Sequence, residues 1–312
     1  MRSLTVSELL TATGGTLLAG GVSAAVTSVS TDSRKAGEGA LFIPLTGERF
    51  DGHDYIDKAL ALGAAGCLCA RTPAAFLPDK FYIAVPDTRL ALKALASWYR
   101  GQFNIPVVQI TGSVGKTTTK EMIASVVSQR YRTLKTAENF NNDIGTPLTL
   151  LGLDDTYEAA VIETGMDHFG EIRYLGEMVR PHIAVITNIG DAHQENFDTP
   201  EEKAEEKLNL FAHTPTIIYN AGDPLLRRLV PARYPDRQLI AVDASRCDLN
   251  GLPYPDAASR ENAAEALTLY GVMGYDMSQV RGGLRSLQNV AMRLELKDGI
   301  NGCKIVNDSY NS

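Results

Sequence analysis

Two spacings of apolar residues alternate along most of the chain, and they predict strands and helices in turn. Short apolar runs at residues 107–110 and 159–163 predict buried strands, and apolar side chains recur at helical spacing over residues 122–127. Further strands are predicted at 183–187, 216–219 and 238–242, with helices at 172–179 and 200–211. This alternation is typical of an α/β fold in which a mostly parallel sheet is flanked by helices.

The first 85 residues predict a small α/β domain of their own. Thr5 and Glu8 fit the capping box that begins a short helix, and a helix at 55–65 is followed by strands at 66–70 and 81–85. Pro86 then marks a natural boundary, and Asp87 can cap a helix that leads into the second domain. We therefore predict an N-terminal domain at 1–85 and a central domain at 86–312.

The last part of the sequence continues the pattern with helices at 262–270 and 277–287 and a strand at 293–297. The sequence then stops at Ser312, soon after the apolar pair Ile305-Val306. Because a strand without a closing element makes a poor end for a domain, we expect a further domain that these residues do not include.

The clearest chemistry lies between the first strand of the central domain and its helix, in the string Gly112-Ser113-Val114-Gly115-Lys116-Thr117-Thr118. The glycines let the backbone curl so that N–H groups point inward, and the following helix presents its positive dipole end to the same point. Lys116 supplies a cation for phosphates, and the Thr117 hydroxyl can hold Mg2+. Ile110 stands where the general pattern has another glycine, so the loop is a shortened version. The strand before and the helix after favour nucleotide binding over an ordinary glycine turn.

Polar residues follow the predicted strands at their carboxyl ends, where open α/β sheets bind ligands. Glu163 ends one apolar strand, Thr187 and Asn188 end another, and His193 lies in the loop beyond. A carboxylate at a strand end either meets a cation or hydrogen-bond donors, or is simply exposed. His193 is either a ligand or a loop histidine bonded to the backbone.

Lys207 lies on a helix whose other charges are typical of a solvated face. On a helical wheel, however, it falls between Leu210 and Phe211, within the arc that carries Ala204 and Leu208. A lysine in such an arc either extends its ammonium to solvent along the apolar surface, or is paired or chemically modified.

The segment 139–148 is interpreted as a polar loop that ends in a turn. It contains three asparagines in four residues, Asn139, Asn141 and Asn142. Their amides can either contact a ligand or cap the loop itself.

Composition and charge restrict the classes of partner. The net charge is −7, and no cluster of lysine and arginine stands out, so neither a nucleic acid nor an anionic membrane is expected to bind. No apolar run approaches the ~20 residues of a membrane span, and the glycine-broken N-terminal segment is a poor signal peptide. The four cysteines show neither C-x-x-C nor metal-ligand spacing, which is typical of free thiols in the cytoplasm.

Four strings together carry a family resemblance, namely residues 112–121, 139–148, 163–172 and 187–193. Over nearly its whole length the chain resembles the Mur ligases of bacterial cell-wall synthesis. Within that family, the Lys120-Glu121 continuation and the string His168-Phe169-Gly170-Glu171-Ile172 are similar to the members that add D-alanyl-D-alanine to UDP-N-acetylmuramoyl-tripeptide.

The resemblance implies a role for each matching residue. Lys116, His193 and Lys207 would be catalytic, and Asp32, Ser33 and Arg34 would bind the UDP end of the substrate. The Mg2+ ligands would be Thr117, Glu163, His193 and Lys207, the last of these as a carbamylated lysine. The ATP contacts would be Gly112, Ser113, Val114, Gly115, Lys116, Thr117, Thr118, Asn142, Asn262, Arg293 and Asp308. The family usually has a proline and a glycine before the arginine, where this chain has Ala291 and Met292.

The implied activity is ATP-dependent amide-bond formation through an acyl phosphate, with D-alanyl-D-alanine as the incoming amine. A monomer is expected, and the family's third domain is expected to be missing from these 312 residues. Two alternatives stay open: another ligase of the superfamily, such as a folate-glutamyl ligase, and a regulatory nucleotide switch. Against the switch, the sequence contains no Asn-Lys-x-Asp string of the kind that reads guanine.

Overall fold

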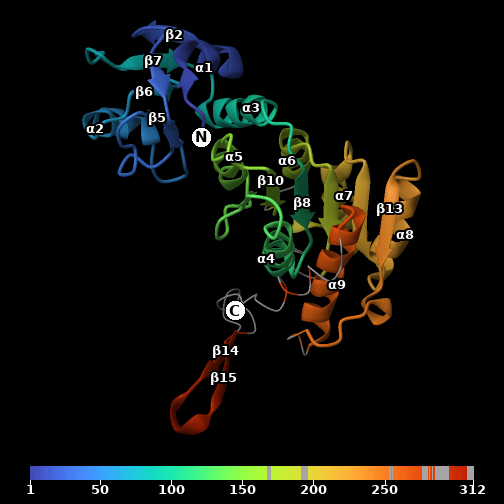
Figure 1. The fold of residues 1–312 in the computed structure, drawn as a ribbon. Helices are drawn as coiled ribbons and strands as arrows, with labels where there is room; N and C mark the ends of the chain where they lie inside the picture. The colour runs from blue at the N-terminus through green and yellow to red at the C-terminus, as the bar shows by residue number, and fades with distance from the viewer. Residues whose placement is uncertain are drawn as a thin grey trace. The chain divides into compact units, whose positions relative to one another are not determined.

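The computed structural model describes residues 1–166, 170–190, 196–252, 254, 256–275, 280, 282, 284 and 295–307. Backbone contacts divide the chain into two units, each with its own sheet (Figure 1). Unit 1 comprises Met1–Ile105 and Thr136–Tyr157, and unit 2 comprises Pro106–Lys135 and Glu158–Ser312. We expected the boundary after residue 85. The division by contacts instead places two further stretches in unit 1: residues 86–105, which include the helix after Asp87, and residues 136–157.

Unit 1 is built on a five-stranded sheet in the order β2-β7-β6-β5-β4, in which only β2 runs antiparallel to its neighbour. The strands of the whole unit, including two outside this sheet, are β1 (Leu4–Thr5), β2 (Thr16–Ala19), β3 (Ala25–Val26), β4 (Ser28–Ser30), β5 (Ala40–Phe42), β6 (Gly66–Cys69) and β7 (Phe81–Ala84). Its helices are α1 (Val6–Thr13), α2 (Ile56–Ala61), α3 (Thr88–Arg100) and α5 (Gly145–Leu151). The capping box at Thr5 and the Asp87 cap of α3 are both confirmed.

Helix α5 corrects one sequence interpretation, because it begins inside the segment that we interpreted as a polar loop. The Asn142 side chain accepts hydrogen bonds from the backbone N–H groups of Ile144 and Gly145, at 3.2 and 2.9 Å. The Asp143 carboxylate lies 3.2 Å from Arg89 Nη1 and 3.1 Å from Lys93 Nζ, both on α3. Capping and ion pairing therefore order a stretch whose composition suggested a turn.

Unit 2 contains a six-stranded parallel sheet in the order β13-β12-β11-β8-β10-β9, as the alternating pattern predicted. These strands are β8 (Val107–Thr111), β9 (Thr133–Lys135), β10 (Ala159–Glu163), β11 (Ile183–Ile186), β12 (Thr216–Asn220) and β13 (Gln238–Val242). Its helices are α4 (Lys116–Val127), α6 (Glu171–Val179), α7 (Pro200–Leu208), α8 (Pro224–Arg233) and α9 (Ala257–Val272). A hairpin of β14 (Glu295–Asp298) and β15 (Lys304–Asn307) follows. The helix predicted at 277–287 lies mostly outside the described residues.

Two elements of unit 2 were missed from the sequence. Strand β9 has only three residues, and α8 contains Pro231, which obscured its helical pattern although Asp223 caps its first turn. Helix α7 is also shorter than the predicted 200–211, because its last turn tightens into a 3-10 helix at Asn209–Phe211.

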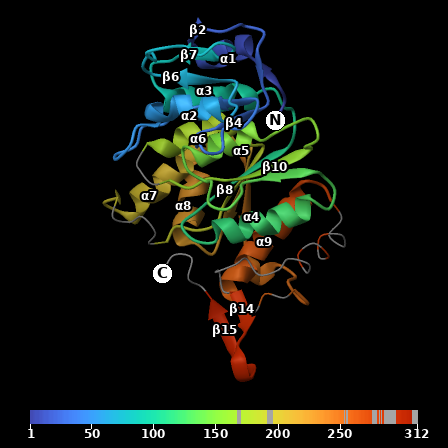
Figure 2. The same ribbon diagram turned by 90° about the vertical axis from the view of Figure 1, so that its left-hand side faces the viewer.

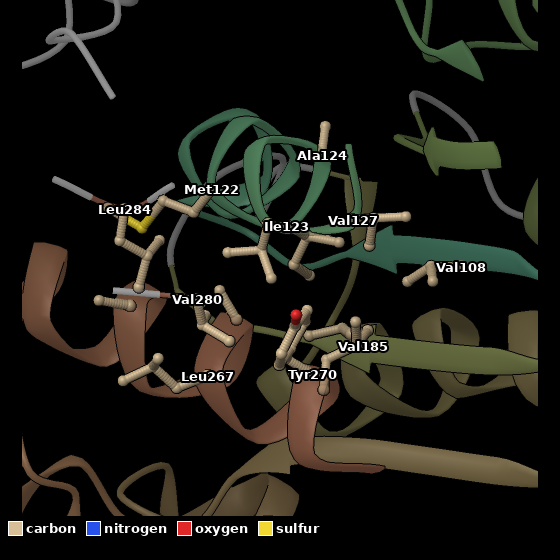
Figure 3. Close-up of a cluster of buried hydrophobic side chains, with 14 of the residues drawn as sticks. Val108, Met122, Ile123, Ala124, Val127, Val185, Leu267, Tyr270, Val280 and Leu284 are labelled. Carbon is tan, nitrogen blue, oxygen red and sulfur yellow. The ribbon is translucent and has the colours of Figure 1, made fainter. Parts of the chain in front are cut away.

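Helices α4 and α9 pack together on one face of this sheet, and α7 and α8 lie on the other side (Figure 2). Figure 3 shows Ile123 and Val127 of α4 directed toward Tyr270 of α9, with Val108 and Val185 from the strands beside them. Fully burying one such side chain contributes about 1.5–3 kcal/mol. This apolar cluster therefore fixes where the first turn of α4 lies at the carboxyl end of the sheet.

The structure also bears on the cysteines and on the membrane. All four cysteines are free thiols, as expected. No helix among the described residues is long and apolar enough to span a bilayer.

Candidate nucleotide-binding site

The glycine loop between β8 and α4 has a backbone shape that side chains would prevent. Gly112 has a φ of 146°, and a Cβ there would lie 2.0 Å from Thr187 Oγ1. Gly115, with a φ of 84°, is the N-cap of α4 and provides no side-chain cap, whereas Asp87, Thr199 and Asp256 cap α3, α7 and α9. The side chain of the N-cap residue thus does not occupy the first-turn N–H groups of α4, and such groups suit an anion.

The end of β11 holds this loop from the side. Ser113 N donates to the Asn188 backbone oxygen at 2.9 Å, and Val114 N donates to Asn188 Oδ1 at 2.9 Å. The Val114 carbonyl oxygen accepts from Thr187 Oγ1 at 2.6 Å and from Asn188 Nδ2 at 3.0 Å. The pair Thr187-Asn188, singled out from its position after a strand, therefore supports the loop.

Lys116 begins α4 and folds back over the loop. Its Nζ donates to the backbone oxygens of Gly112 at 2.9 Å and Ser113 at 3.0 Å. The ammonium is therefore held beside the same backbone curl whose N–H groups suit phosphate. Thr117 and Thr118 follow it in the first turn of the helix.

Glu163 is buried, so the interpretation of an exposed strand end is wrong. Its side chain is 1% exposed, its Oε1 accepts from Thr117 Oγ1 at 3.0 Å, and its Oε2 lies 3.8 Å from the Nζ of buried Lys120. Lys120 also pairs with Glu121 at 3.1 Å. Sequence reasoning used Lys120 only as a family marker; its spacing of three residues from Thr117, on one helical face, could have indicated its position.

The Thr117 hydroxyl and the Glu163 carboxylate fit a Mg2+ site. Both offer oxygen, the ligand that Mg2+ prefers, and they already lie within hydrogen-bonding distance. No group of three or more His, Cys, Asp or Glu side chains suited to a metal occurs among the described residues. Because Mg2+ in nucleotide sites takes most of its ligands from phosphates and water, two protein oxygens are sufficient.

Lys207 is directed inward, as the helical wheel predicted, and its ammonium does not reach solvent. The side chain is 1% exposed, and Nζ donates to the Gly112 carbonyl oxygen at 3.4 Å. Burial, together with the positive charges of Lys116 and Lys203, lowers the pKa of Lys207 to about 7, and the negative charge of Glu206 partly opposes this shift. A substantial fraction of neutral amine is therefore present near neutral pH.

Helix α9 approaches the loop at Asn262. A Cβ on Gly115 would lie 2.7 Å from Asn262 Oδ1, so a side chain there would displace the Asn262 amide. One turn later, Glu265 accepts from Thr119 Oγ1 at 3.4 Å, and burial raises its pKa well above the usual range, with Glu261 adding to the effect. Glu265, which sequence reasoning missed, is thus a buried acid between α4 and α9.

Four predicted ATP or metal residues cannot be placed at this site. His193, Arg293 and Asp308 lie outside the described residues. Asn142 belongs to unit 1, where its Oδ1 accepts from the backbone N–H groups of Ile144 and Gly145 at the start of α5. The structure thus brings together the loop, Glu163, Lys207 and Asn262.

The predicted UDP contacts form a separate cluster in unit 1. The Asp32 carboxylate accepts from Arg34 through its backbone N at 3.0 Å and through Nε and Nη2 at 2.9 Å each. These hydrogen bonds lower the pKa of Asp32 to about 2. Ser33 lies between them in the turn, and the Arg34 side chain is 77% exposed.

The chain is similar to known proteins in both sequence and structure. Residues 110–243 match the Mur ligase middle domain, and residues 25–100 match the Mur ligase family catalytic domain. The UDP-N-acetylmuramoyl-tripeptide–D-alanyl-D-alanine ligase of Bacillus subtilis is 37% identical over 305 residues, covering 91% of this chain and 67% of that protein. The Escherichia coli enzyme of the same name is 35% identical, over 100% of this chain and 74% of that protein.

Solved structures give the same result. A crystal structure of MurF from Acinetobacter baumannii superposes with a TM-score of 0.92 at 29% identity, covering 100% of this chain and 74% of that one. MurF ligase from Thermotoga maritima, in complex with ADP, gives a TM-score of 0.80 at 28% identity, over 92% of this chain and 72% of that one. The chain therefore belongs to the MurF group of the Mur ligase family.

Proposed function

We propose that this chain is an ATP-dependent, ADP-forming ligase that joins D-alanyl-D-alanine to UDP-N-acetylmuramoyl-tripeptide in peptidoglycan precursor synthesis. One observation supports the nucleotide chemistry above all others: Lys116, Thr117 and buried Glu163 meet at the uncapped N-terminus of α4. The substrates are those named for the B. subtilis and E. coli relatives.

The reaction needs activation because a carboxylate is a poor electrophile. A carboxylate oxygen of the tripeptide attacks the γ-phosphorus of ATP, ADP leaves, and an acyl phosphate forms. The amine of D-alanyl-D-alanine then attacks the acyl carbon, inorganic phosphate leaves with the C–O bond electrons, and the amine loses a proton. No protein nucleophile takes part, so the protein contributes positioning and charge stabilisation.

The phosphate loop is the main contributor to that stabilisation. The N–H groups at the start of α4 and the Lys116 ammonium would face the transferring phosphoryl group, whose charge is spread over its oxygens. Thr118 and Asn262 contact the nucleotide from the first turn of α4 and from α9. Thr117 and Glu163 would hold Mg2+, which would supply positive charge beside the phosphates of ATP.

Lys207 is proposed to carry a carbamate. A neutral amine can react with CO2, and the pKa of about 7 keeps much of this amine neutral. The carbamate would place an anionic oxygen ligand beside the loop. The roles of His193, Arg293 and Asp308 stay predictions, as do a monomeric state and a cytoplasmic location.

In unit 1, Asp32, Ser33 and Arg34 are proposed to bind the UDP end of the substrate. The Asp32 carboxylate already holds the Arg34 guanidinium through two side-chain bonds at 2.9 Å. This arrangement leaves the remaining N–H groups of the guanidinium available to a diphosphate, which arginine recognises well.

Phosphate release measured with and without each substrate tests the function. We expect release to depend on ATP, UDP-N-acetylmuramoyl-tripeptide and D-alanyl-D-alanine together, and Lys116→Met to reduce ADP binding in calorimetry by more than 100-fold. Lys58→Met, which removes an exposed lysine of α2, is the matched control and should bind ADP normally. Release that depends on another amine would assign the chain to a different ligase, and a preference for guanine nucleotides would favour the switch.

A further inference from the structure

Helix α7 contains two buried lysines one turn apart, and each donates a hydrogen bond to a different loop of the nucleotide site. Lys203 is 0% exposed, and its Nζ donates to the Gly190 carbonyl oxygen. Lys207 is 1% exposed, and its Nζ donates to the Gly112 carbonyl oxygen at 3.4 Å. Residues four apart lie on the same helical face, so the helix contacts both loops at once.

The Gly190 carbonyl oxygen accepts a second hydrogen bond, from Ser113 Oγ at 3.2 Å. Ser113 is itself buried, and its backbone N donates to the Asn188 oxygen at 2.9 Å. The segment from 188 to 190 therefore contacts the phosphate loop through both of its end residues, Asn188 and Gly190. Lys203 contacts the same segment from α7, so this oxygen joins the helix to the phosphate loop.

The charges of the region favour an anionic occupant. Lys116, Lys203 and Lys207 place three amino groups close enough for the first two to act electrostatically on the third. The nearby carboxylate of Glu206 is engaged in the local structure, because it accepts from Gly170 N and from Asn209 Nδ2, each at 2.8 Å. A polyphosphate bound at the loop would be attracted by this field.

We propose that Lys203 is a positioning residue of the nucleotide site: its bond to the Gly190 carbonyl oxygen holds the segment after β11 against Ser113 and thereby fixes the loop that receives the phosphates of ATP. This proposal rests on the nucleotide binding proposed above. Lys203 was not selected from the sequence because it lies among the acidic residues of the same helix. Its spacing of four from Lys207 is the signal that could have identified it.

The test compares Lys203→Met, Lys203→Arg and the control Lys58→Met in the whole chain. ADP affinity is measured by calorimetry, and the nucleotide-free melting temperature is measured in parallel. For Lys203→Met we expect a loss of affinity of roughly 10- to 100-fold, the range for a buried charge-assisted hydrogen bond. Lys203→Arg, which keeps a cationic donor, should recover most of that loss, and Lys58→Met should match the wild type.

The outcomes separate positioning from a general structural role. Weakened ADP binding by a folded Lys203→Met protein, with recovery in Lys203→Arg, supports the proposal. Wild-type affinity in Lys203→Met, or a lower melting temperature without lower affinity, overturns it. If Lys203→Met does not fold, Lys203→Gln is measured instead with an expected loss of roughly 3- to 10-fold, and unchanged affinity again overturns the proposal. Absence of ADP binding by the wild type would instead contradict the proposed function itself.

Discussion

The two candidate binding regions of this chain are built in opposite ways. Asp32 and Arg34 in unit 1 are two residues apart in sequence, and the arginine is largely exposed. In unit 2, the bond from Thr117 to Glu163 spans 46 residues, and the bond from Lys207 to Gly112 spans 95. One site is a local turn at the surface, whereas the other is assembled from distant segments in the interior.

This difference determines how a substitution at each site affects the stability of the fold and the affinity for a ligand. Exposed charges are solvated and screened, so they can be rearranged or replaced with little effect on folding. Buried charges are stabilising only when their partners are in place, and removing one partner leaves the other unsatisfied. We therefore expect substitutions in unit 2 to change both affinity and stability, and substitutions in unit 1 to change affinity alone.

Among the substitutions that contrast the two units, replacing Glu163 with glutamine should give the largest effect. The amide keeps the shape of the side chain but loses the charge and one acceptor oxygen beside Thr117. We expect ADP affinity in the presence of Mg2+ to fall by roughly 100-fold or more, because breaking a buried charge pair costs on the order of 3–5 kcal/mol. Calorimetry with Mg2+ and with a chelator measures the change.

The same chemical change in unit 1, Asp32→Asn, is the matched comparison. It should leave ADP affinity and the melting temperature unchanged, since Asp32 is close to the surface and belongs to the other unit. If Glu163→Gln weakens ADP binding equally with Mg2+ and with chelator, the carboxylate acts on the loop rather than on the metal.

Features that depend on residues close in sequence were easier to predict than features that depend on distant contacts. The capping box at Thr5, the Asp87 cap and the glycine loop depend on neighbours in sequence, and each was predicted correctly. The buried state of Glu163 depends on contacts across strands, so the pattern left two interpretations open. Helix α5 was missed because Asn142 and the ion pairs of Asp143 order a segment rich in turn-forming residues.

The two buried lysines of α7 show most clearly what the sequence pattern does not predict. Helical spacing placed Lys207 inward, but the same spacing was not applied to Lys203, whose neighbours suggested a solvated face. The acceptors of both side chains are backbone carbonyls, which carry no sequence signature. A pattern of side chains can therefore predict that a lysine is buried without predicting what it binds.

A pH experiment on Lys207 should give an intermediate effect. The folded-state pKa is about 7 and the ordinary value is 10.5, so between these pH values the unfolded chain binds more protons than the folded one. The free energy of unfolding should therefore rise with pH across this window, by about 2 kcal/mol from pH 7 to pH 9. Urea unfolding in CO2-free buffer measures the rise.

Lys207→Met should remove that rise, because methionine has no proton to lose. Adding bicarbonate at pH 8 should increase the mass of the wild type by that of a carbamate, and should leave the Lys207→Met protein unchanged. A wild-type stability that is flat between pH 7 and pH 9 would mean that the Lys207 amine is better solvated than its burial indicates.

Arg34→Ala should give the smallest effect. It tests the exposed site of unit 1, as Glu163→Gln tests the buried site of unit 2. The guanidinium is exposed, so its loss should not change the melting temperature or ADP affinity. The KM for UDP-N-acetylmuramoyl-tripeptide should rise by roughly tenfold, the effect of losing one charged hydrogen bond to a phosphate. Arg34 lowers the pKa of Asp32 to about 2, so the ion pair stays intact near neutral pH. The ratio of the KM of Arg34→Ala to the KM of the wild type should therefore be constant from pH 6 to pH 9. A lower melting temperature with an unchanged KM would instead show that the exposed turn serves folding, and the contrast between the two units would fail.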